Sequence, residues 1–212
     1  MVKVNKKYKD RLFRMVFNRK EELLSLYNAV SHSEYTNPED LEIHTLDDVI
    51  YMKMKNDLAF LIDDVLNLWG HQSTWNPNMP VRGTLYIVEE YRKYIEQNGL
   101  NLYGSRLITL PIPQFYVFYN GLKEEPDYIE LKLSDAFSRV HSELEPCMEF
   151  KAIMMNINRG HNEGLMKQCS TLREYAEFVA RIRERTKAGK ALGTAVEDEQ
   201  DSCIRDGVLA AL

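Results

Sequence analysis

Hydrophobic residues in the first part of the chain recur at the spacing of an amphipathic helix. Within residues 8–31, apolar side chains return every three or four positions and share one side of a helix. The positions are Leu12, Phe13, Met15, Val16, Phe17, Leu23, Leu26, Tyr27 and Val30. Asn18 interrupts the pattern, so either one helix or two short helices satisfy it. The Ser-, Thr-, Asn- and Pro-containing stretch 33–40 then predicts a loop.

Three short runs that follow favour β-strands. Residues 48–55 alternate two sets of side chains, while 58–62 and 65–69 are apolar runs of strand length. The dipeptide Asp63-Asp64 separates the last two runs and suits a hairpin turn. The pattern therefore predicts three consecutive strands, the last two joined as a hairpin.

The rest of the pattern alternates helical and extended segments. Pro80 suits the first turn of a helix, and Asn98-Gly99 suits its end. In order, the pattern predicts a helix over 81–97, strands over 114–121, 127–133 and 148–157, and helices over 172–185 and about 195–206.

This order predicts an α/β protein with a mixed sheet flanked by helices. A helix, three strands, a helix and a returning strand form the first part, over about 8–121. A further strand and helices, over about 127–207, follow as a helical C-terminal extension. No internal repeat and no change of composition divides the chain, so we interpret residues 1–212 as one domain.

Composition narrows the class of protein. The chain is 44% hydrophobic and 28% charged, and no run reaches the roughly 18–20 apolar residues of a membrane helix. We expect a cytoplasmic protein without a membrane partner or an organic cofactor. The three cysteines lack paired spacing and are expected to be reduced thiols. The net charge of −5 argues against a general nucleic-acid coat.

Charge is distributed unevenly along the chain. Residues 3–20 carry five lysines and three arginines against the single Asp10. This basic end, which includes Lys9 and Arg14, could meet a phosphate backbone, although a solvated helix face explains it equally well. Arg82, at the start of the predicted helix 81–97, could contact a phosphate or form a structural salt bridge.

Several blocks of sequence resemble one nuclease family. The order α-β-β-β-α-β resembles the core of the PD-(D/E)xK, or restriction-endonuclease-like, nucleases. Within this superfamily the chain looks like the Rpn recombination-promoting, transposase-like nucleases. The blocks that carry this resemblance are KDRLFRMVFNRKEELLSLYNAV, LDDVIYMKMKNDLAFLI, HQSTWNPNMPVRGTLY, LPIPQFYVFYNG, LSDAF, NINRGHNEGLMKQC and LREYAEFV, and they extend over nearly the whole chain.

The resemblance implies a catalytic site on two adjacent strands. Asp57 would be the first metal-binding carboxylate, and Gln72 would close the Glu-x-Gln motif of this family. Two carboxylates would hold Mg²⁺, with Mn²⁺ or Ca²⁺ as substitutes, to activate water and offset charge on the scissile phosphate. An acid of the first helix, for which we take Glu22, could also contact the metal; an exposed helical charge is the alternative for Glu22, Glu21 and Asp10.

Gly70 stands where this motif should begin with glutamate. The chain reads GHQS where the family pattern leads us to expect EHQS. Glycine offers only its backbone, so one anionic ligand is missing and cleavage should be impaired. The glycine could be an engineered change or a natural loss, or another acid could replace the missing one. The nearby acids Asp63, Asp64, Glu89 and Glu90 are better explained by the hairpin turn and by a solvated helix face.

Two classes of function remain open. The first is a Mg²⁺-dependent DNA endonuclease, a homodimer acting on DNA, that Gly70 impairs. The second is a catalytically inactive DNA- or protein-binding member of the same fold. A true transposase is less consistent with the sequence, which shows no separate DNA-recognition domain. His71 is expected to be a packed or surface residue, and His161 a turn residue, rather than catalytic groups.

Overall fold

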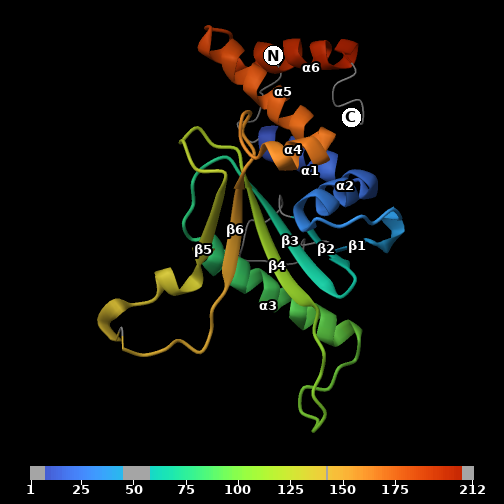
Figure 1. Ribbon diagram of the computed structural model, residues 1–212, viewed down its shortest axis with the longest axis vertical. Coiled ribbons are helices and arrows are strands. Elements are labelled where there is room, and N and C mark those ends of the chain that lie inside the picture. Colours follow the sequence, from blue (N-terminus) through green and yellow to red (C-terminus); the bar gives the residue numbers. More distant parts are fainter. Residues whose placement is uncertain (1–7, 45–57, 142, 207–212) are drawn as a thin grey trace.

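The described chain forms a mixed sheet with helices on both faces (Figure 1). The computed structural model describes residues 8–44, 58–141 and 143–206. Its strands are β1 (Glu42–His44), β2 (Leu58–Ile62), β3 (Val65–Gln72), β4 (Ile112–Tyr119), β5 (Tyr128–Lys132) and β6 (Lys151–Asn156). Its α-helices are α1 (Tyr8–Phe17), α2 (Lys20–Ser31), α3 (Met79–Gln97), α4 (Glu163–Gln168), α5 (Ser170–Lys187) and α6 (Leu192–Asp206).

The sheet combines antiparallel edges with a parallel centre. Its six strands lie in the order β1-β2-β3-β4-β6-β5. β1, β2 and β3 are antiparallel neighbours, and β5 is antiparallel to β6. β3, β4 and β6 run parallel, with α3 connecting β3 to β4. The carboxyl ends of these three central strands therefore meet at one edge of the sheet.

A two-residue turn sets the register of the β2–β3 hairpin. Ile62 pairs with Val65, so Asp63 and Asp64 alone form the loop. Both have positive φ, 44° and 58°, as a two-residue turn of this hand requires. The Tyr35 hydroxyl donates a hydrogen bond of 2.5 Å to the Asp63 carboxylate. The hairpin predicted from the Asp-Asp dipeptide is confirmed.

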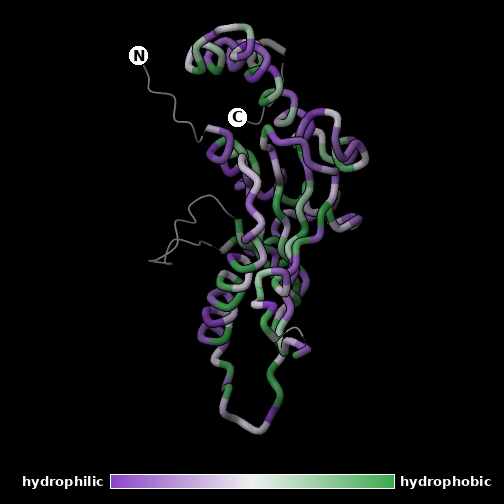
Figure 2. The backbone as a smooth tube through the Cα atoms, turned by 90° about the vertical axis from the view of Figure 1, so that its left-hand side faces the viewer, coloured by the Kyte–Doolittle hydropathy of each residue, from purple (hydrophilic) through white to green (hydrophobic). Residues whose placement is uncertain are grey.

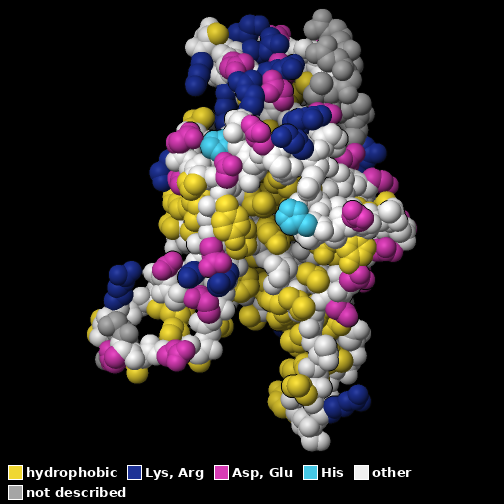
Figure 3. All heavy atoms as spheres, in the orientation of Figure 1, with side chains coloured by type: hydrophobic (Ala, Val, Ile, Leu, Met, Phe, Trp, Pro, Cys, Tyr) yellow, Lys and Arg dark blue, Asp and Glu magenta, His cyan; other side chains and the backbone are white. Residues whose placement is uncertain are grey.

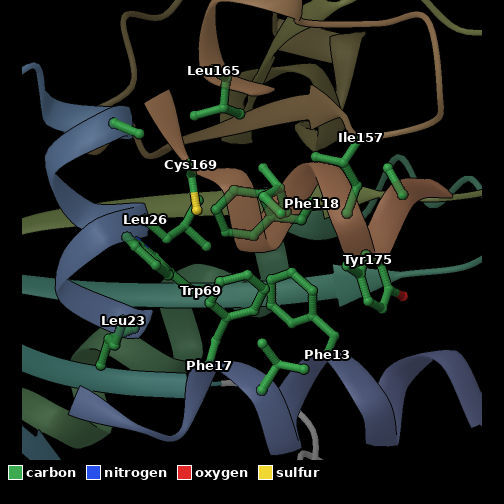
Figure 4. Packing of buried hydrophobic residues seen from close by; sticks show 14 of the residues in the cluster. Phe13, Phe17, Leu23, Leu26, Trp69, Phe118, Ile157, Leu165, Cys169 and Tyr175 are labelled. Atoms are coloured by element: carbon green, nitrogen blue, oxygen red, sulfur yellow. The ribbon is translucent and has the colours of Figure 1, made fainter. Parts of the chain in front are cut away.

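Alternation along the strands divides the core into two clusters. On one face Leu68, Phe115 and Val117 pack with the buried side of α3. On the other face Trp69 and Phe118 pack against α1, α2 and α5, as the close view in Figure 4 shows. Successive strand residues point to opposite faces, so neighbouring positions of β3 serve different clusters.

Aromatic side chains dominate the second cluster. Phe13 of α1 lies with its ring centroid 4.7 Å from Phe17, 4.9 Å from His71, 5.3 Å from Phe118 and 5.6 Å from Tyr175. These spacings are in the range that aromatic pairs prefer. Phe13 thus connects α1 to the central strands and to α5.

The connection between α3 and β4 extends away from the sheet. It forms the lowest part of the molecule in Figure 1, and Figure 2 shows hydrophobic segments within it. Leu102, Tyr103 and Leu107 are exposed there, at 57%, 97% and 93% of their surface. In the described part of the chain, no helix is long and apolar enough to cross a membrane.

Most predicted elements are present with shifted ends. The N-terminal pattern forms two helices that break between Phe17 and Lys20. β3 continues three residues beyond the predicted end at position 69, and β4 begins and ends two residues earlier than predicted. β1 and α4 were not predicted, because three and six residues are too short to show a period. The predicted strand 48–55 lies outside the described residues.

Candidate functional site

The carboxyl ends of the three parallel strands form a polar edge. Gln72, Tyr119 and Asn156 end β3, β4 and β6 in matching register. The backbone N–H of Asn120 donates to the carbonyl of Gln72 at 2.9 Å, and that of Ile157 donates to Tyr119 at 2.8 Å. Open α/β sheets bind ligands at such carboxyl ends. The polar edge is therefore the candidate functional site.

Gly70 and Gln72 lie toward this end of β3. Gly70 is buried and pairs with Val117 of β4, while Gln72 is half-buried and pairs with Tyr119. By alternation both share the face of Leu68, the face that α3 covers. Asp57 lies outside the described residues; Leu58, which follows it, pairs with Trp69.

The residues described at this position do not by themselves fit a divalent cation. Gly70 has no side chain, and Gln72 offers a neutral amide where hard cations favour carboxylates. Across residues 8–44, 58–141 and 143–206, no three His, Cys, Asp or Glu side chains group as metal ligands. The metal-binding roles of Asp57, Gly70 and Glu22 therefore stay predictions.

His71 faces the opposite side of β3 and belongs to a buried network. Its side chain is inaccessible to solvent. Nδ1 lies 2.8 Å from the Asp10 carboxylate of α1, and Nε2 lies 2.9 Å from the Tyr175 hydroxyl of α5. Ser73 donates to the same oxygen of Asp10 at 2.9 Å. The sequence left His71 as a packed or a surface residue, and the structure shows that it is packed.

Burial and hydrogen bonds set the protonation of this network. Burial lowers the pKa of His71, although the hydrogen bond and charge of Asp10 oppose this shift. Burial would raise the pKa of Asp10, but hydrogen bonds from His71 and Ser73 lower it below its usual value. A neutral His71 donates from Nδ1 to the Asp10 carboxylate and accepts from Tyr175 at Nε2.

This network does not resemble a catalytic triad. In a triad the serine hydroxyl contacts the histidine, whereas Ser73 contacts Asp10 and Tyr175 occupies the other ring nitrogen. Burial also raises the pKa of Tyr175 well above its usual value, which opposes a nucleophilic or basic role. Asp10, His71 and Tyr175 therefore hold α1 and α5 to the end of β3.

Two cations meet beside this network at one backbone carbonyl. The Asn120 carbonyl accepts from the Arg183 guanidinium at 2.7 Å and from the Lys9 amine at 3.1 Å. Arg183 also donates to the side chains of Asn120, at 2.8 Å, and Asn158, at 2.6 Å. Burial and then the charge of Arg183 lower the pKa of Lys9 to about 8. The polar edge is therefore locally electropositive.

The other predicted contact residues are distributed over several elements. Glu22 of α2 accepts a hydrogen bond of 2.5 Å from Thr171 at the start of α5. Arg82 of α3 donates to Tyr86 at 3.0 Å. Lys9 and Arg14 belong to α1, which packs in the other core cluster. The described residues therefore do not join Lys9, Arg14 and Arg82 into one surface, and their DNA-binding roles stay predictions.

The acids considered as replacements for residue 70 have other roles. Asp63 and Asp64 form the hairpin turn, as expected. Glu89 pairs with Arg92 at 2.7 Å on the outside of α3. The expectation for Glu90 was wrong: it is 2% exposed and pairs with Lys93 at 3.2 Å. Glu90 belongs to the inner side of α3 because its position follows the buried Tyr86 by one helical turn.

Sequence reasoning missed the residues that complete the polar edge. In the sequence, Tyr175 and Arg183 are simply members of the helix predicted over 172–185, and Asn120 and Asn158 belong to no motif. Tyr175 meets His71 across 104 positions, and Arg183 meets Asn120 across 63. No local spacing encodes such contacts, so only the packing of α5 onto the strand ends reveals them.

His161 lies in the turn that follows β6, as predicted. Its Nδ1 contacts the Asp127 carboxylate at 2.6 Å, and its Nε2 lies 3.3 Å from Glu124. Tyr116, Phe118 and Tyr119 of β4 also pack in the core rather than forming a base-stacking surface.

Comparison with known proteins does not assign this chain to a family. The chain matches no family model, no curated protein and no solved structure. The resemblance to Rpn nucleases therefore rests on the sequence blocks alone, and the functional conclusions drawn from it are proposals.

Proposed function

We propose that this chain is a DNA endonuclease of the Rpn type whose cleavage activity Gly70 impairs. The observation that carries the proposal is the position of Gly70 and Gln72 toward the carboxyl end of β3, beside the start of β2. The order of the β2–β3 hairpin, α3 and the parallel β4 supports the restriction-endonuclease-like core that this proposal assumes. The sequence blocks support the same reading.

The impairment follows from the chemistry that such nucleases use. A divalent cation, Mg²⁺ or its substitutes Mn²⁺ and Ca²⁺, supplies charge neutralisation and water activation when carboxylates hold it. Gly70 removes one of the two expected carboxylates. Loss of a ligand of this kind should weaken cleavage by on the order of 100-fold or more.

DNA is the proposed partner, and Lys9, Arg14 and Arg82 are the proposed phosphate contacts. Cleavage of both strands requires two sites, so we propose a homodimer acting on DNA in the cytoplasm. Guanidinium and ammonium groups would supply affinity without sequence preference.

A plasmid-cleavage assay tests the proposal. The original chain, Gly70→Glu, Gly70→Ala and the double variant Gly70→Glu/Asp57→Ala would each be incubated with supercoiled DNA in Mg²⁺ and Mn²⁺. We expect cleavage by Gly70→Glu alone, because it restores a carboxylate while Asp57 remains. Gly70→Ala is the matched control, since it adds a side chain to the strand without a charge.

Folding must be measured beside cleavage, because Gly70 is buried in β3. Circular dichroism and thermal melting would show whether each variant keeps the sheet. If Gly70→Glu is folded and does not cut, or if the Asp57→Ala double variant cuts equally well, the nuclease proposal is wrong.

A binding protein without catalysis is the second candidate. The glycine itself favours it, because a chain that only binds DNA or a protein needs no carboxylate at position 70. Binding of uncut DNA by a folded Gly70→Glu variant would support this alternative.

A further inference from the structure

A pocket of about 270 Å³ lies at the carboxyl ends of β4 and β6. The turns after these strands form one side, with Lys123, Glu124, Asn158, Arg159 and His161, and α5 forms the other, with Arg183, Glu184 and Lys187. Figure 3 shows Lys and Arg side chains, interspersed with Asp and Glu, at the top of the face drawn, where α5 lies. The pocket thus combines the ligand-binding end of a parallel sheet with a basic helix.

Most charges around the pocket are already compensated. Arg159 forms ion pairs with Glu177, at 3.3 Å, and with Glu184. Lys123 pairs with Glu125. These cations are neutralised locally, so they contribute little net attraction for an anion.

Arg183 and Lys187 differ from these neighbours. Arg183 is half-buried, and its three hydrogen bonds go to amide and carbonyl oxygens of Asn120 and Asn158. Among the described residues, no carboxylate contacts Arg183 or the exposed Lys187. Burying a guanidinium without a counter-charge is costly, and proteins usually pair such groups. A bound anion that is not part of the described chain would supply the counter-charge that Arg183 and Lys187 lack.

The geometry around Arg183 strengthens this argument. Asn120 is fully buried, and its carbonyl also accepts from Lys9, so two positive charges converge on one neutral oxygen. Like charges this close repel one another. Burial also lowers the pKa of Arg183, as expected for a desolvated cation. Asn120 and Asn158 hold the guanidinium in place, so its position beside the pocket is fixed before a ligand arrives.

We propose that this pocket binds a phosphate group, with Arg183 and Lys187 as its two cationic ligands. A phosphate monoester carries nearly two negative charges, which matches two cations that lack a carboxylate partner. The Arg183 guanidinium supplies a positive charge at a fixed position, because both N–H groups of its Nη2 are already donated to Asn120, and the lysine acts as a mobile point charge. The volume is at the small end for ligand pockets and suits one phosphate with its attached sugar. This inference does not depend on cleavage activity.

Calorimetric titration in EDTA tests the proposal without a metal. The ligands would be inorganic phosphate, a deoxynucleoside 5′-monophosphate and the corresponding nucleoside, at constant ionic strength. We expect both phosphates to bind and the nucleoside not to bind. Lys187→Gln should weaken binding roughly tenfold, because it removes one of two charge-assisted contacts.

Arg173→Gln is the matched control, because Arg173 is also an exposed cation of α5 and does not line the pocket. It should leave binding unchanged. Arg183→Gln should abolish binding, but it also removes hydrogen bonds to Asn120 and Asn158. Lys187→Gln is therefore the decisive variant. Absence of phosphate binding, or equal affinity in Lys187→Gln and the original chain, would overturn the proposal.

Short oligonucleotides separate the two sources of phosphate. If a 5′-phosphorylated strand binds more tightly than its 5′-hydroxyl counterpart and is displaced by the mononucleotide, the ligand is a nucleic-acid end. If the mononucleotide binds and neither strand displaces it, the ligand is a small phosphate ester. Both results support a phosphate site, and both are independent of the Gly70→Glu cleavage assay.

Discussion

Two adjacent residues of β3, Gly70 and His71, face opposite sides of the sheet and differ in role. Gly70 faces α3 and lacks the side chain that the resemblance to Rpn nucleases leads us to expect there. His71 faces α1 and α5 and makes hydrogen bonds through both ring nitrogens. A shift of one position along a strand exchanges these faces. The proposed chemistry and the observed packing therefore lie on opposite faces of one strand.

His71 should make the stability of the protein depend on pH. Its pKa is lowered in the folded state because burial penalises the imidazolium. In the unfolded chain it titrates near about 6.5, so below this pH the unfolded state binds the proton more readily. The stability contributed by neutral His71 is thus present above about pH 6.5 and is lost as the pH falls.

Denaturant unfolding at pH 7.5 and pH 5.5 measures this effect. The original chain should lose roughly 1 kcal/mol across this interval because of His71. In His71→Gln this loss should be absent, although the variant is less stable at pH 7.5. His32→Gln, a change at an exposed histidine, should keep the loss. An undiminished loss in His71→Gln would contradict the assignment.

At the scale of elements, the hairpin shows how a turn stores strain. Asp63 and Asp64 both adopt positive φ, which costs a residue with a Cβ roughly 1–2 kcal/mol. The hydrogen bond from the Tyr35 hydroxyl offsets part of this free-energy cost at Asp63. The Asp64 carbonyl accepts a hydrogen bond of 2.8 Å from the backbone N–H of Ile112, which a substitution at position 64 leaves in place, whereas no hydrogen bond to its carboxylate is found among the described residues.

Asp64→Gly should therefore stabilise the protein by roughly 0.5–1 kcal/mol, because glycine adopts positive φ freely but gains entropy in the unfolded chain. Thermal melting would measure the change. Asp64→Ala removes the same carboxylate and keeps the Cβ, so it should not stabilise. Equal melting temperatures for the glycine and alanine variants would show that backbone strain is not the cause.

For the molecule as a whole, the C-terminal helix combines apolar packing with a buried charge. α6 lies against α5 and contributes Ala195 and Cys203 to the same apolar cluster. Glu199 of α6 is fully buried and lies 3.3 Å from Arg181 and 2.9 Å from Arg185 of α5. Removing this charge should release α6 while the sheet stays folded.

Glu199→Gln should lower stability by roughly 1–3 kcal/mol and increase proteolysis between α5 and α6. Limited digestion followed by mass spectrometry would locate the cleavage near Gly189. Glu197→Gln makes the same change at an exposed position of α6 and should behave like the original chain. Cleavage spread over the sheet in Glu199→Gln would mean that α6 unfolds only with the whole molecule.

Much of the fold could be read from the sequence because it is encoded locally. The apolar stripe of α5, the strand runs around Asp63-Asp64 and the ends of α3 depend on neighbours within a few positions. These signals predict a mixed α/β sheet flanked by helices, which the structure confirms. They do not predict β1 or α4, whose few residues carry no measurable period.

Local sequence is enough to identify the residues at positions of possible chemistry, above all the glycine at position 70. What surrounds these residues follows only from the packing of distant segments. His71 meets Tyr175 across 104 positions, and Arg183 meets Asn120 across 63. Such contacts arise when α5 packs over the carboxyl ends of the strands, and no local pattern requires that packing. The phosphate pocket is therefore a property of the folded chain, because its two uncompensated cations line it only after α5 reaches the sheet.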